Sequence, residues 1–354
     1  MAEPAPVPPA SLARIATFVD ARLDELLAGE RARWVDVDPD LAGLLDEIHQ
    51  MVRSGGKRLR PAFCYWAFVG GGGEDGDQRV IDAGAALELM HASALFHDDV
   101  IDDAATRRGA PTTHTRYTRR HDDAGWAGEA RRFGEGVAIL AGDLALVLAD
   151  ELLIGVSDAA WRLWNELRLE LNVGQFLDVL GSVRRDRRLE RAERIARYKS
   201  GKYTVERPLH LGALLAGADE RLFSELSAFG LPLGDAFQMR DDVIGAFGDP
   251  AVTGKPVGDD LRQGKPTWLL ATAVARATEA QQVVLDRVGT PDLDATGVAA
   301  AQQVLVATGA LDAAEQRIDA LAAEARAALA GASLTDGARC ELAALADYVV
   351  ARRA

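Results

Sequence analysis

The chain has 354 residues, of which 48% are hydrophobic and 27% charged, and its formal net charge is -14 at pH 7. This composition provides ample material for a large buried core. The acidic balance argues against general nucleic-acid binding, since phosphate backbones attract clustered Lys and Arg. The two cysteines, Cys64 and Cys340, show neither metal-ligand spacing nor a disulfide pattern, which favours a cytoplasmic protein.

The first ten residues, 1–10, are rich in Pro and Ala and contain no basic segment followed by an apolar run, so we expect a disordered lead. From residue 11 onward, apolar residues recur every three or four positions, which predicts helices, and no run alternates as a strand would. The glycine-rich or polar segments 70–76, 104–132 and 245–265 are expected to separate helices. The expected helices include 80–103, 134–155, 159–181, 188–216, 219–244, 266–285, 296–307, 310–330 and 336–351. We therefore predict a single all-α domain over 11–354, built as one large helical bundle.

The most apolar window of the chain, 137–156, is the best candidate for a membrane span. It contains Asp143, Asp150 and Glu151, and each of these charges would cost roughly 2.5–3.5 kcal/mol at the centre of a bilayer. We therefore expect a buried helix here and no membrane span.

The strongest chemical signal is the run Asp98-Asp99-Val100-Ile101-Asp102-Asp103 at the end of an apolar helix. Asp98 and Asp102 are four residues apart and share a helix face, where like charges repel each other. The helix dipole also disfavours anions at this end. Carboxylate oxygens suit Mg²⁺, which often completes its coordination with substrate phosphates. The alternative is a solvated acidic helix end, but the apolar residues just before the run favour a buried helix.

A second acidic pair, Asp241-Asp242, follows another apolar stretch, 222–237. Two buried helices that both end in paired aspartates predict one shared metal site, with the two helix ends facing each other.

Basic segments accompany both acidic clusters. They are GGKRLRP at 55–61, Arg107-Arg108, Lys199-Ser200 with Lys202, and the glycine-lysine pairs at 254–255 and 264–265. Glycine permits close backbone approach, and Lys and Arg bind phosphate oxygens. Each segment alone is more simply a basic surface turn, but together with two acidic clusters they predict a site for magnesium-bridged diphosphates.

These motifs resemble those of the trans-isoprenyl (polyprenyl) diphosphate synthases. The resemblance runs from Gly55 to about Thr267, and the motifs occur in the family's order. They are GGKRLRP at 55–61, DDVIDDAATRRG at 98–109, Lys199-Ser200, and QMRDDVIGAFGDPAVTGKPVGDDLRQGK at 238–265. The family implies an all-helical fold around a deep central cavity, usually in a homodimer. It also implies condensation of isopentenyl diphosphate with an allylic diphosphate, assisted by about three Mg²⁺ ions per active site.

The resemblance assigns a role to each matching residue. Asp98, Asp102 and Asp241 would bind Mg²⁺, with Asp99 and Asp242 in support. The allylic diphosphate would be held by Arg107, Lys199, Ser200, Gln238, Lys255 and Lys265. Isopentenyl diphosphate would be held by Lys57, Arg60, His91 and Arg108. A lone histidine such as His91 is more often a core residue, but it lies seven residues before Asp98 on the same helix face.

One position departs from the family pattern. The second motif usually reads Asp-Asp-x-x-Asp, whereas Gly245 stands in its last place here. We expect activity to survive, since the first aspartate of that motif is generally the metal ligand. Asp249 is a candidate to compensate for the missing carboxylate.

The expected product length depends on residues one turn before Asp98. Family members that stop at fifteen carbons commonly have an aromatic ring there, whereas this chain has Ser93 and Ala94. We therefore predict a product of twenty carbons or longer, with geranylgeranyl diphosphate favoured and Met90 as a candidate lower stop. The alternative is that Ser93 and Ala94 only allow close helix packing while another helix closes the cavity.

Two other functions remain open at this point. A class I terpene cyclase shares metal-bound diphosphate ionisation but needs no site for isopentenyl diphosphate, so segment 55–61 and Arg108 argue against it. A non-catalytic subunit of a heteromeric prenyl synthase tends to lose acidic residues; Gly245 is one such loss, but the first acidic cluster is intact.

Overall fold

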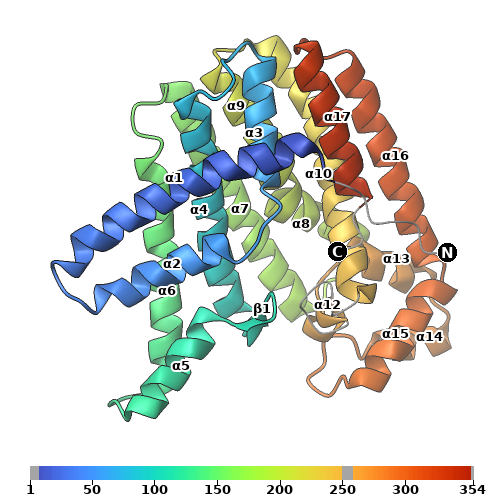
Figure 1. Cartoon of the computed structure of the whole chain (residues 1–354). Coiled ribbons are helices and arrows are strands. Elements are labelled where there is room, and N and C mark those ends of the chain that lie inside the picture. Colours follow the sequence, from blue (N-terminus) through green and yellow to red (C-terminus); the bar gives the residue numbers. More distant parts are fainter. Residues whose placement is uncertain (1–7, 249–257, 352–354) are drawn as a thin grey trace. The chain divides into compact units, whose positions relative to one another are not determined.

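The computed structural model describes residues 8–248 and 258–351, and helices make up nearly all of their regular structure (Figure 1). Within these residues the only strands are β1 (Thr106–Arg107) and β2 (Ala110–Pro111), which pair antiparallel. The helices, in chain order, are α1 Ala10–Val35, α2 Leu41–Arg53, α3 Leu59–Gly70, α4 Gln78–Ile101, α5 Thr113–Ala124, α6 Ala130–Glu151, α7 Asp158–Arg184, α8 Leu189–Ile195, the π-helix η1 Ala196–Glu206, α9 Arg207–Leu215, α10 Glu220–Phe247, α12 Asp259–Gln263, α13 Trp268–Arg276, α14 Glu279–Leu285, α15 Ala295–Ala307, α16 Ala310–Ala330 and α17 Asp336–Val350. The predicted all-α class is thus confirmed.

The chain groups into two compact units. The first unit comprises Ala10–Tyr65 and Glu74–Ser157, and the second contains Trp66–Gly73 and everything from Asp158 onward. The single domain predicted over 11–354 stays a prediction. None of the described helices is both long and apolar enough to cross a membrane.

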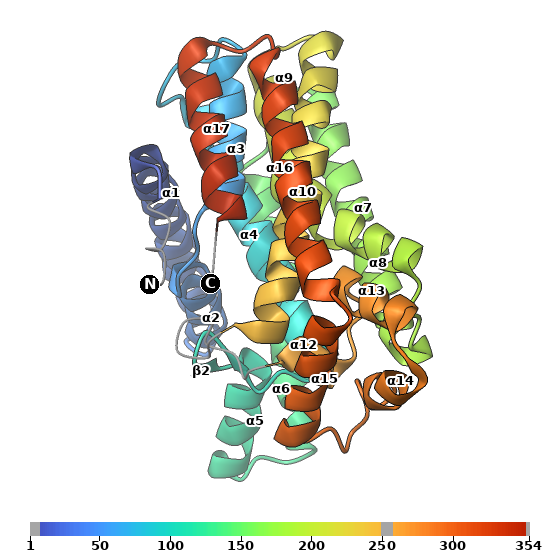
Figure 2. The same cartoon turned by 90° about the vertical axis from the view of Figure 1, so that its right-hand side faces the viewer.

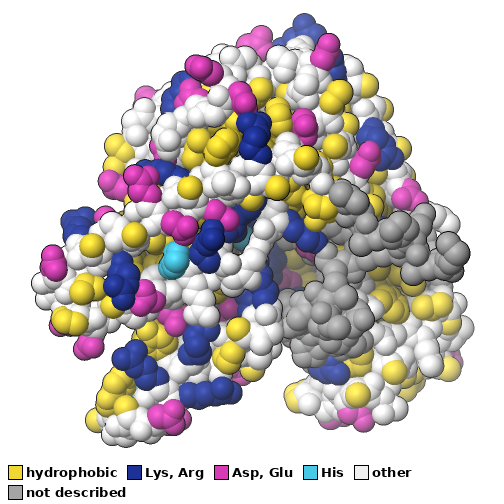
Figure 3. Space-filling view, in the orientation of Figure 1, with side chains coloured by type: hydrophobic (Ala, Val, Ile, Leu, Met, Phe, Trp, Pro, Cys, Tyr) yellow, Lys and Arg dark blue, Asp and Glu magenta, His cyan; other side chains and the backbone are white. Residues whose placement is uncertain are grey.

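In the first unit, α4 packs against α6 and α1 against α2. Small residues let α4 approach its neighbours, because a Cβ at Gly84 would lie 3.0 Å from Val19 and 3.2 Å from Pro61. The ion pairs Arg31–Asp46 and Arg53–Asp20 connect α1 to α2. Figure 3 shows charged side chains of both signs interspersed over these two helices. Packing against these helices fixes the position of α4 within the first unit.

In the second unit, α10 packs against α16 and the π-helix η1, and α17 lies beside α16 (Figure 2). Paired glycines bring η1 against α10: a Cβ at Gly234 would lie 2.6 Å from the carbonyl oxygen of Gly201. On the other side, a Cβ at Gly174 of α7 would lie 2.2 Å from the backbone nitrogen of Lys199. The widened π turn is therefore held between two helices that come unusually close to it, and such turns are frequent at functional sites.

Several expectations about the elements were wrong. The segment 188–216, expected to be one helix, contains α8, η1 and α9, and the segment 266–285 contains the two helices α13 and α14. Segment 104–132 was expected to be a break, but it contains the β1–β2 hairpin and helix α5. Helix α5 buries polar residues, Thr113, His114 and His121, so it lacks the apolar period that predicts a helix. The second acidic pair does not end its helix, because α10 continues past Asp242 to Phe247. Helix α6, expected to be buried, exposes several large apolar side chains: Ile139, Leu140 and Val147.

Candidate functional site

The first acidic cluster lies at the C-terminal end of α4, in the first unit. Asp102 is the C-cap residue, and its backbone N–H donates to the carbonyl of Asp98. Asp103, just after the helix, is in the left-handed backbone conformation, and the N–H of Ala104 donates to the carbonyl of Asp99. The chain therefore turns back before strand β1, and the guanidinium of Arg107 on that strand lies 3.2 Å from Asp98 and 2.6 Å from Asp99. Three residues of the predicted site are thus in contact at this helix end.

Asp99 is almost completely buried at this helix end. Burial raises the pKa of its carboxyl, although Arg107 opposes the shift. Its Oδ2 atom is buried and accepts no hydrogen bond from the described residues. A hard cation would satisfy this oxygen, and the nearby carboxylates of Asp98 and Asp102 supply the ligand type that Mg²⁺ prefers, so the residues fit the predicted metal.

Among the described residues, no group of three or more His, Cys, Asp or Glu side chains could enclose a metal ion by itself. Mg²⁺ is commonly bound by one or two carboxylates, with substrate phosphates and water completing its coordination. The helix end therefore suits an ion that arrives together with a diphosphate.

The predicted site for isopentenyl diphosphate also lies within the first unit. Arg108 donates to Ser54 Oγ at 3.1 Å and to the carbonyl of Gly55, which connects the hairpin to the loop before α3. His91, on α4, has its pKa held well below the ordinary value by burial and then by the charges of Arg60 and Arg108. His91, Arg60 and Arg108 therefore share one strongly positive region, and Lys57 is exposed on the adjoining loop. The clustered cations of this region are suited to binding an anion such as a phosphate group.

Lys199 and Ser200 lie on the π-helix η1 in the second unit, both partly buried. The Nζ atom of Lys199 is 2.5 Å from Oδ2 of Asp178, a buried residue of α7. Asp178 was missed from the sequence. A charged residue in the otherwise apolar stretch from Phe176 to Leu180 was the available signal, because a buried charge needs a partner.

Gln238 and the second acidic pair lie on α10. Gln238 donates to Oδ1 of Asp242 at 2.7 Å. Asp242 is buried, and burial followed by repulsion from Asp260 raises its pKa well above the ordinary value. Asp260 also lies against Gly245, since a Cβ at residue 245 would lie 1.9 Å from Oδ2 of Asp260. The sequence missed Asp260, whose α12 is only five residues long.

The remaining site residues of the second unit have simpler accounts. The backbone N–H of Lys265 donates to the carbonyl of Asp260 at 3.0 Å, which places Lys265 at the end of α12. Lys255 and Asp249 lie outside the described residues. That the ends at 98–102 and 241–242 face each other stays a prediction.

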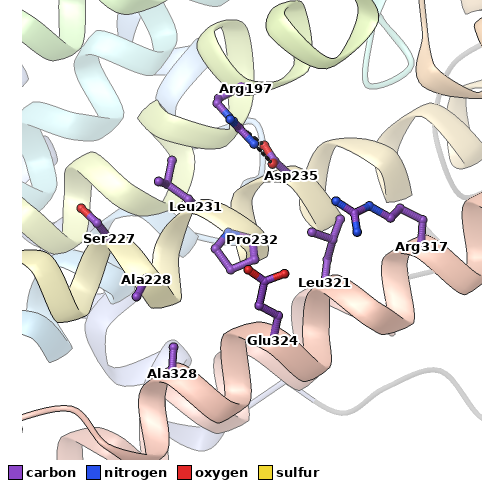
Figure 4. Close-up of a pocket in the computed structure, with 10 residues that line it drawn as sticks. All are labelled: Arg197, Ser227, Ala228, Leu231, Pro232, Asp235, Arg317, Leu321, Glu324 and Ala328. Atoms are coloured by element: carbon purple, nitrogen blue, oxygen red, sulfur yellow. Dashed lines mark hydrogen bonds and ion pairs between the residues drawn. The ribbon is translucent and has the colours of Figure 1, made fainter. Parts of the chain in front are cut away.

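A surface pocket of about 390 Å³ lies elsewhere in the second unit, between α10 and α16 (Figure 4). Its apolar lining includes Leu231, Pro232 and Leu321, and an Arg197–Asp235 ion pair of 2.5 Å closes one end. It contains none of the predicted site residues.

Comparison with known proteins places this arrangement in a family. The Polyprenyl synthetase family matches residues 42–305. The geranylfarnesyl diphosphate synthase of Aeropyrum pernix is 34% identical over 330 residues, which cover 90% of this chain and 96% of that protein. The geranylgeranyl diphosphate synthase of Mycobacterium tuberculosis is 38% identical over 259 residues, 72% of this chain and 66% of that protein.

A solved structure is similar over nearly the whole chain. It is the geranylgeranyl pyrophosphate synthase from Corynebacterium glutamicum, complexed with isoprenyl diphosphate and magnesium. The two chains are 37% identical with a TM-score of 0.92, and the match covers 97% of this chain and 99% of that one. The chain therefore belongs to the polyprenyl synthetase family, and it is a prenyltransferase of the trans-prenyl diphosphate synthase type with the isoprenoid synthase fold.

Proposed function

We propose that the chain catalyses the Mg²⁺-dependent head-to-tail condensation of isopentenyl diphosphate with an allylic diphosphate, with geranylgeranyl diphosphate (C20) as product. The observation that carries the proposal is the arrangement of charge at the end of α4. There Asp98 and the buried Asp99 contact Arg107, and Asp102 lies one helical turn from Asp98. Such a site supplies both metal ligands and a phosphate-binding cation.

The proposed metal ligands are Asp98 and Asp102 from the first unit and Asp241 from the second. About three Mg²⁺ ions per active site, when bound there, would supply positive charge that stabilises a departing diphosphate. Asp99 supports its neighbour Asp98 through Arg107, which contacts both carboxylates. Asp242, which accepts a hydrogen bond from Gln238, has the supporting role that the family resemblance implies.

The allylic diphosphate is proposed to accept hydrogen bonds from Arg107, Lys199, Ser200, Gln238, Lys255 and Lys265. Lys199 contacts Asp178 at 2.5 Å, and its ammonium group has three N–H donors, so it can keep this carboxylate while it also donates to phosphate oxygens. The contact with Asp178 holds the ammonium group in place for the diphosphate.

Isopentenyl diphosphate is proposed to bind the positive region formed by Lys57, Arg60, His91 and Arg108. The depressed pKa of His91 keeps its imidazole neutral in the free protein, so it can donate one hydrogen bond to a phosphate oxygen without adding charge. The double bond of this substrate then attacks the allylic cation, and a proton is lost to the released diphosphate. Apolar side chains must exclude water, which would otherwise quench the cation.

The proposed product length follows from α4. Ser93 is buried and Ala94 is partly buried one turn before Asp98, and neither carries a ring that could stop a growing tail. Met90, also buried, stands one turn further from the acidic end. The two relatives reported above make products of different lengths, so family membership alone leaves the length open.

We also propose that the protein is a homodimer. Helix α7 exposes large apolar side chains along one stripe, with Leu169 62%, Val173 52%, Phe176 64% and Val183 79% exposed. Their spacing of three, four and seven residues places them on a single helix face. A twofold axis through such a face would pair it with itself and bury it in both copies.

The test is incubation of the purified protein with Mg²⁺, isopentenyl diphosphate and each allylic primer in turn, followed by measurement of product size. We expect linear prenyl diphosphates ending mainly at C20, and no product when Mg²⁺ is chelated. A cyclised hydrocarbon formed from a single allylic diphosphate would instead identify a terpene cyclase. No turnover with both substrates present would identify a non-catalytic subunit.

A further inference from the structure

Arg58 has an unusual place in the basic loop 54–58, which leads into α3 in the first unit. Lys57 beside it is exposed and Arg60, at the start of α3, is partly buried, whereas Arg58 is only 6% exposed. Its backbone adopts the left-handed conformation, with φ at 49°, which is uncommon for a residue other than glycine. A buried arginine in an unfavourable backbone conformation requires compensating contacts.

The guanidinium of Arg58 supplies those contacts to three different helices. It donates to Oε2 of Glu88 on α4 at 2.6 Å, to Oδ1 of Asp20 on α1 at 2.9 Å, and to the carbonyl of Val52 on α2 at 2.5 Å. Glu88 is itself 5% exposed, so this is a buried ion pair. Although burial disfavours the charged form, Glu88 and then Asp20 raise the pKa of Arg58 above its ordinary value.

The loop backbone at Gly56 passes close to the side chain of Arg58. A Cβ at Gly56 would lie 2.9 Å from Nη1 of Arg58 and 3.8 Å from Oε2 of Glu88, so the loop comes very close to the ion pair. From the hairpin, Arg108 donates to Ser54 and to the carbonyl of Gly55. The segment that carries Lys57 is thus fixed by one arginine from inside the fold and by another from the hairpin.

Glu88 belongs to the same helix as His91 and Asp98. Its carboxylate accepts a hydrogen bond from Arg58. The pair therefore sets the position of the basic loop relative to the helix that carries the other groups of the proposed site. A displacement of about 1 Å in such a group can cost about 100-fold in rate.

We propose that Arg58, through its ion pair with Glu88, is a positioning residue that fixes Lys57 and Arg60 for the binding of isopentenyl diphosphate. The inference rests on the proposed function and deepens it, because it assigns a role to two residues that need not touch substrate. The proposal requires that loss of Arg58 or Glu88 raise the KM for isopentenyl diphosphate while the KM for the allylic substrate stays unchanged.

The test compares Arg58→Met, Arg58→Lys and Glu88→Gln with Arg22→Met. The control variant breaks the 2.6 Å pair between Arg22 on α1 and Asp82 on α4, which also joins these two helices but does not touch the loop. We expect Arg58→Met and Glu88→Gln to raise the KM for isopentenyl diphosphate about 10- to 100-fold. Arg58→Lys should recover part of this loss, since it restores one of the three contacts, and Arg22→Met should leave both KM values near wild type.

Instability is separated from mispositioning by the double variant Arg58→Met with Glu88→Leu. Replacing both members of a buried pair by apolar side chains is often neutral for stability. We expect its melting temperature to recover relative to Arg58→Met while the raised KM persists. If the KM recovers together with the melting temperature, or if both KM values rise equally, the positioning role is refuted.

Failure of the proposed function gives a different result. In that case the wild-type protein neither turns over nor binds isopentenyl diphosphate in titration calorimetry. A wild type that is active, with variants that bind isopentenyl diphosphate as tightly as it does, would reject only the role of Arg58.

Discussion

Ser93 carries the prediction of product length. It is 4% exposed on α4, one turn before the acidic end of that helix. A larger side chain at this position would therefore enter the space beside α4 in which the growing tail is proposed to lie. We expect Ser93→Phe to shorten the main product to fifteen carbons, because an aromatic ring would block the tail. Product sizing with Ser93→Ala as the control measures this directly. If Ser93→Phe still makes the wild-type product and remains folded, the tail does not pass this residue.

Gly245 gives a second prediction, on the effect of restoring the family's usual aspartate. A Cβ at this position would lie 1.9 Å from Oδ2 of Asp260, and an aspartate would also add a like charge beside Asp242. We expect Gly245→Asp to destabilise the protein by about 1–3 kcal/mol and to lower kcat, although it restores the motif. Urea unfolding and steady-state rates provide the measurements.

The matched control is Gly29→Asp, which introduces the same side chain into helix α1, where a Cβ meets nothing within 4 Å. This control should unfold close to wild type. A Gly245→Asp protein that is as stable as the control and at least as active as wild type would show that Asp260 moves aside without cost.

Residues that meet across a short stretch of chain were predictable from the sequence. Arg107 follows Asp98 by nine positions, and the few residues between the end of α4 and strand β1 cannot carry it far from the helix end. Asp178 and Asp260 were missed because their partners are set by packing. Asp178 reaches Lys199 only since Gly174 lets α7 approach η1, and Asp260 reaches α10 only since Gly245 has no side chain. Neither of these two close approaches between helices produces a periodic residue pattern that can be read from the sequence.

At the scale of elements, the π-helix η1 was predicted only as part of a regular helix over 188–216. Its position follows from Gly174 and Gly234 on the two neighbouring helices and from Gly201 within η1, where added Cβ atoms would meet backbone. Helix α5 was missed for the opposite reason. Its buried face is polar, with Thr113 and Arg116 both bound to Glu47 of α2, so tertiary hydrogen bonds replace the apolar period.

The close approach at Gly174 predicts how strongly η1 controls Lys199. In Gly174→Ala the new methyl group would lie 2.2 Å from the backbone nitrogen of Lys199, so one of the two helices must shift. We expect kcat to fall about 100-fold, because a displacement near 1 Å moves Lys199 away from its substrate. Gly136→Ala on α6, where nothing lies within 4 Å, is the matched control and should keep wild-type rates. If Gly174→Ala and Gly136→Ala have equal kcat values, Lys199 has no role in catalysis.

At the scale of the whole molecule, the apolar stripe on α7 predicts the oligomeric state. We expect the wild type to elute as a dimer and Val173→Asp with Phe176→Asp to elute as a monomer in light-scattering chromatography. Burial of each large apolar side chain contributes about 1.5–3 kcal/mol, so two charges at the centre of the stripe should prevent pairing. Val283→Asp alters a side chain on α14 that is at least as exposed, at 68%, and this variant should remain dimeric. A wild type that is monomeric at micromolar concentration would contradict the assignment.

Buried histidines predict how the stability of the molecule depends on pH. His210 is fully buried in the second unit, stacked on Phe223 at 3.6 Å and within 3.3 Å of Arg207. Burial and then the charges of Arg207 and Lys202 lower its pKa to about 3, from an ordinary value of 6.5. Between these two values the unfolded chain binds a proton that the folded chain does not. Stability from this residue is therefore complete above about pH 6.5 and is lost progressively as the pH falls towards 3.

This loss amounts to at most about 1.4 kcal/mol per pH unit for one proton. We expect His210→Gln to be less stable than wild type at pH 7 but to show a shallower decline in unfolding free energy between pH 6 and pH 4. The buried carboxyls of Asp99 and Asp242 shift in the opposite direction, and His91 shifts in the same direction as His210, but all three are present in both proteins. Their contributions cancel in the difference between the two curves. Parallel curves would mean that His210 is already protonated in the folded state, stabilised by Glu206 through Ser227, which contacts both residues.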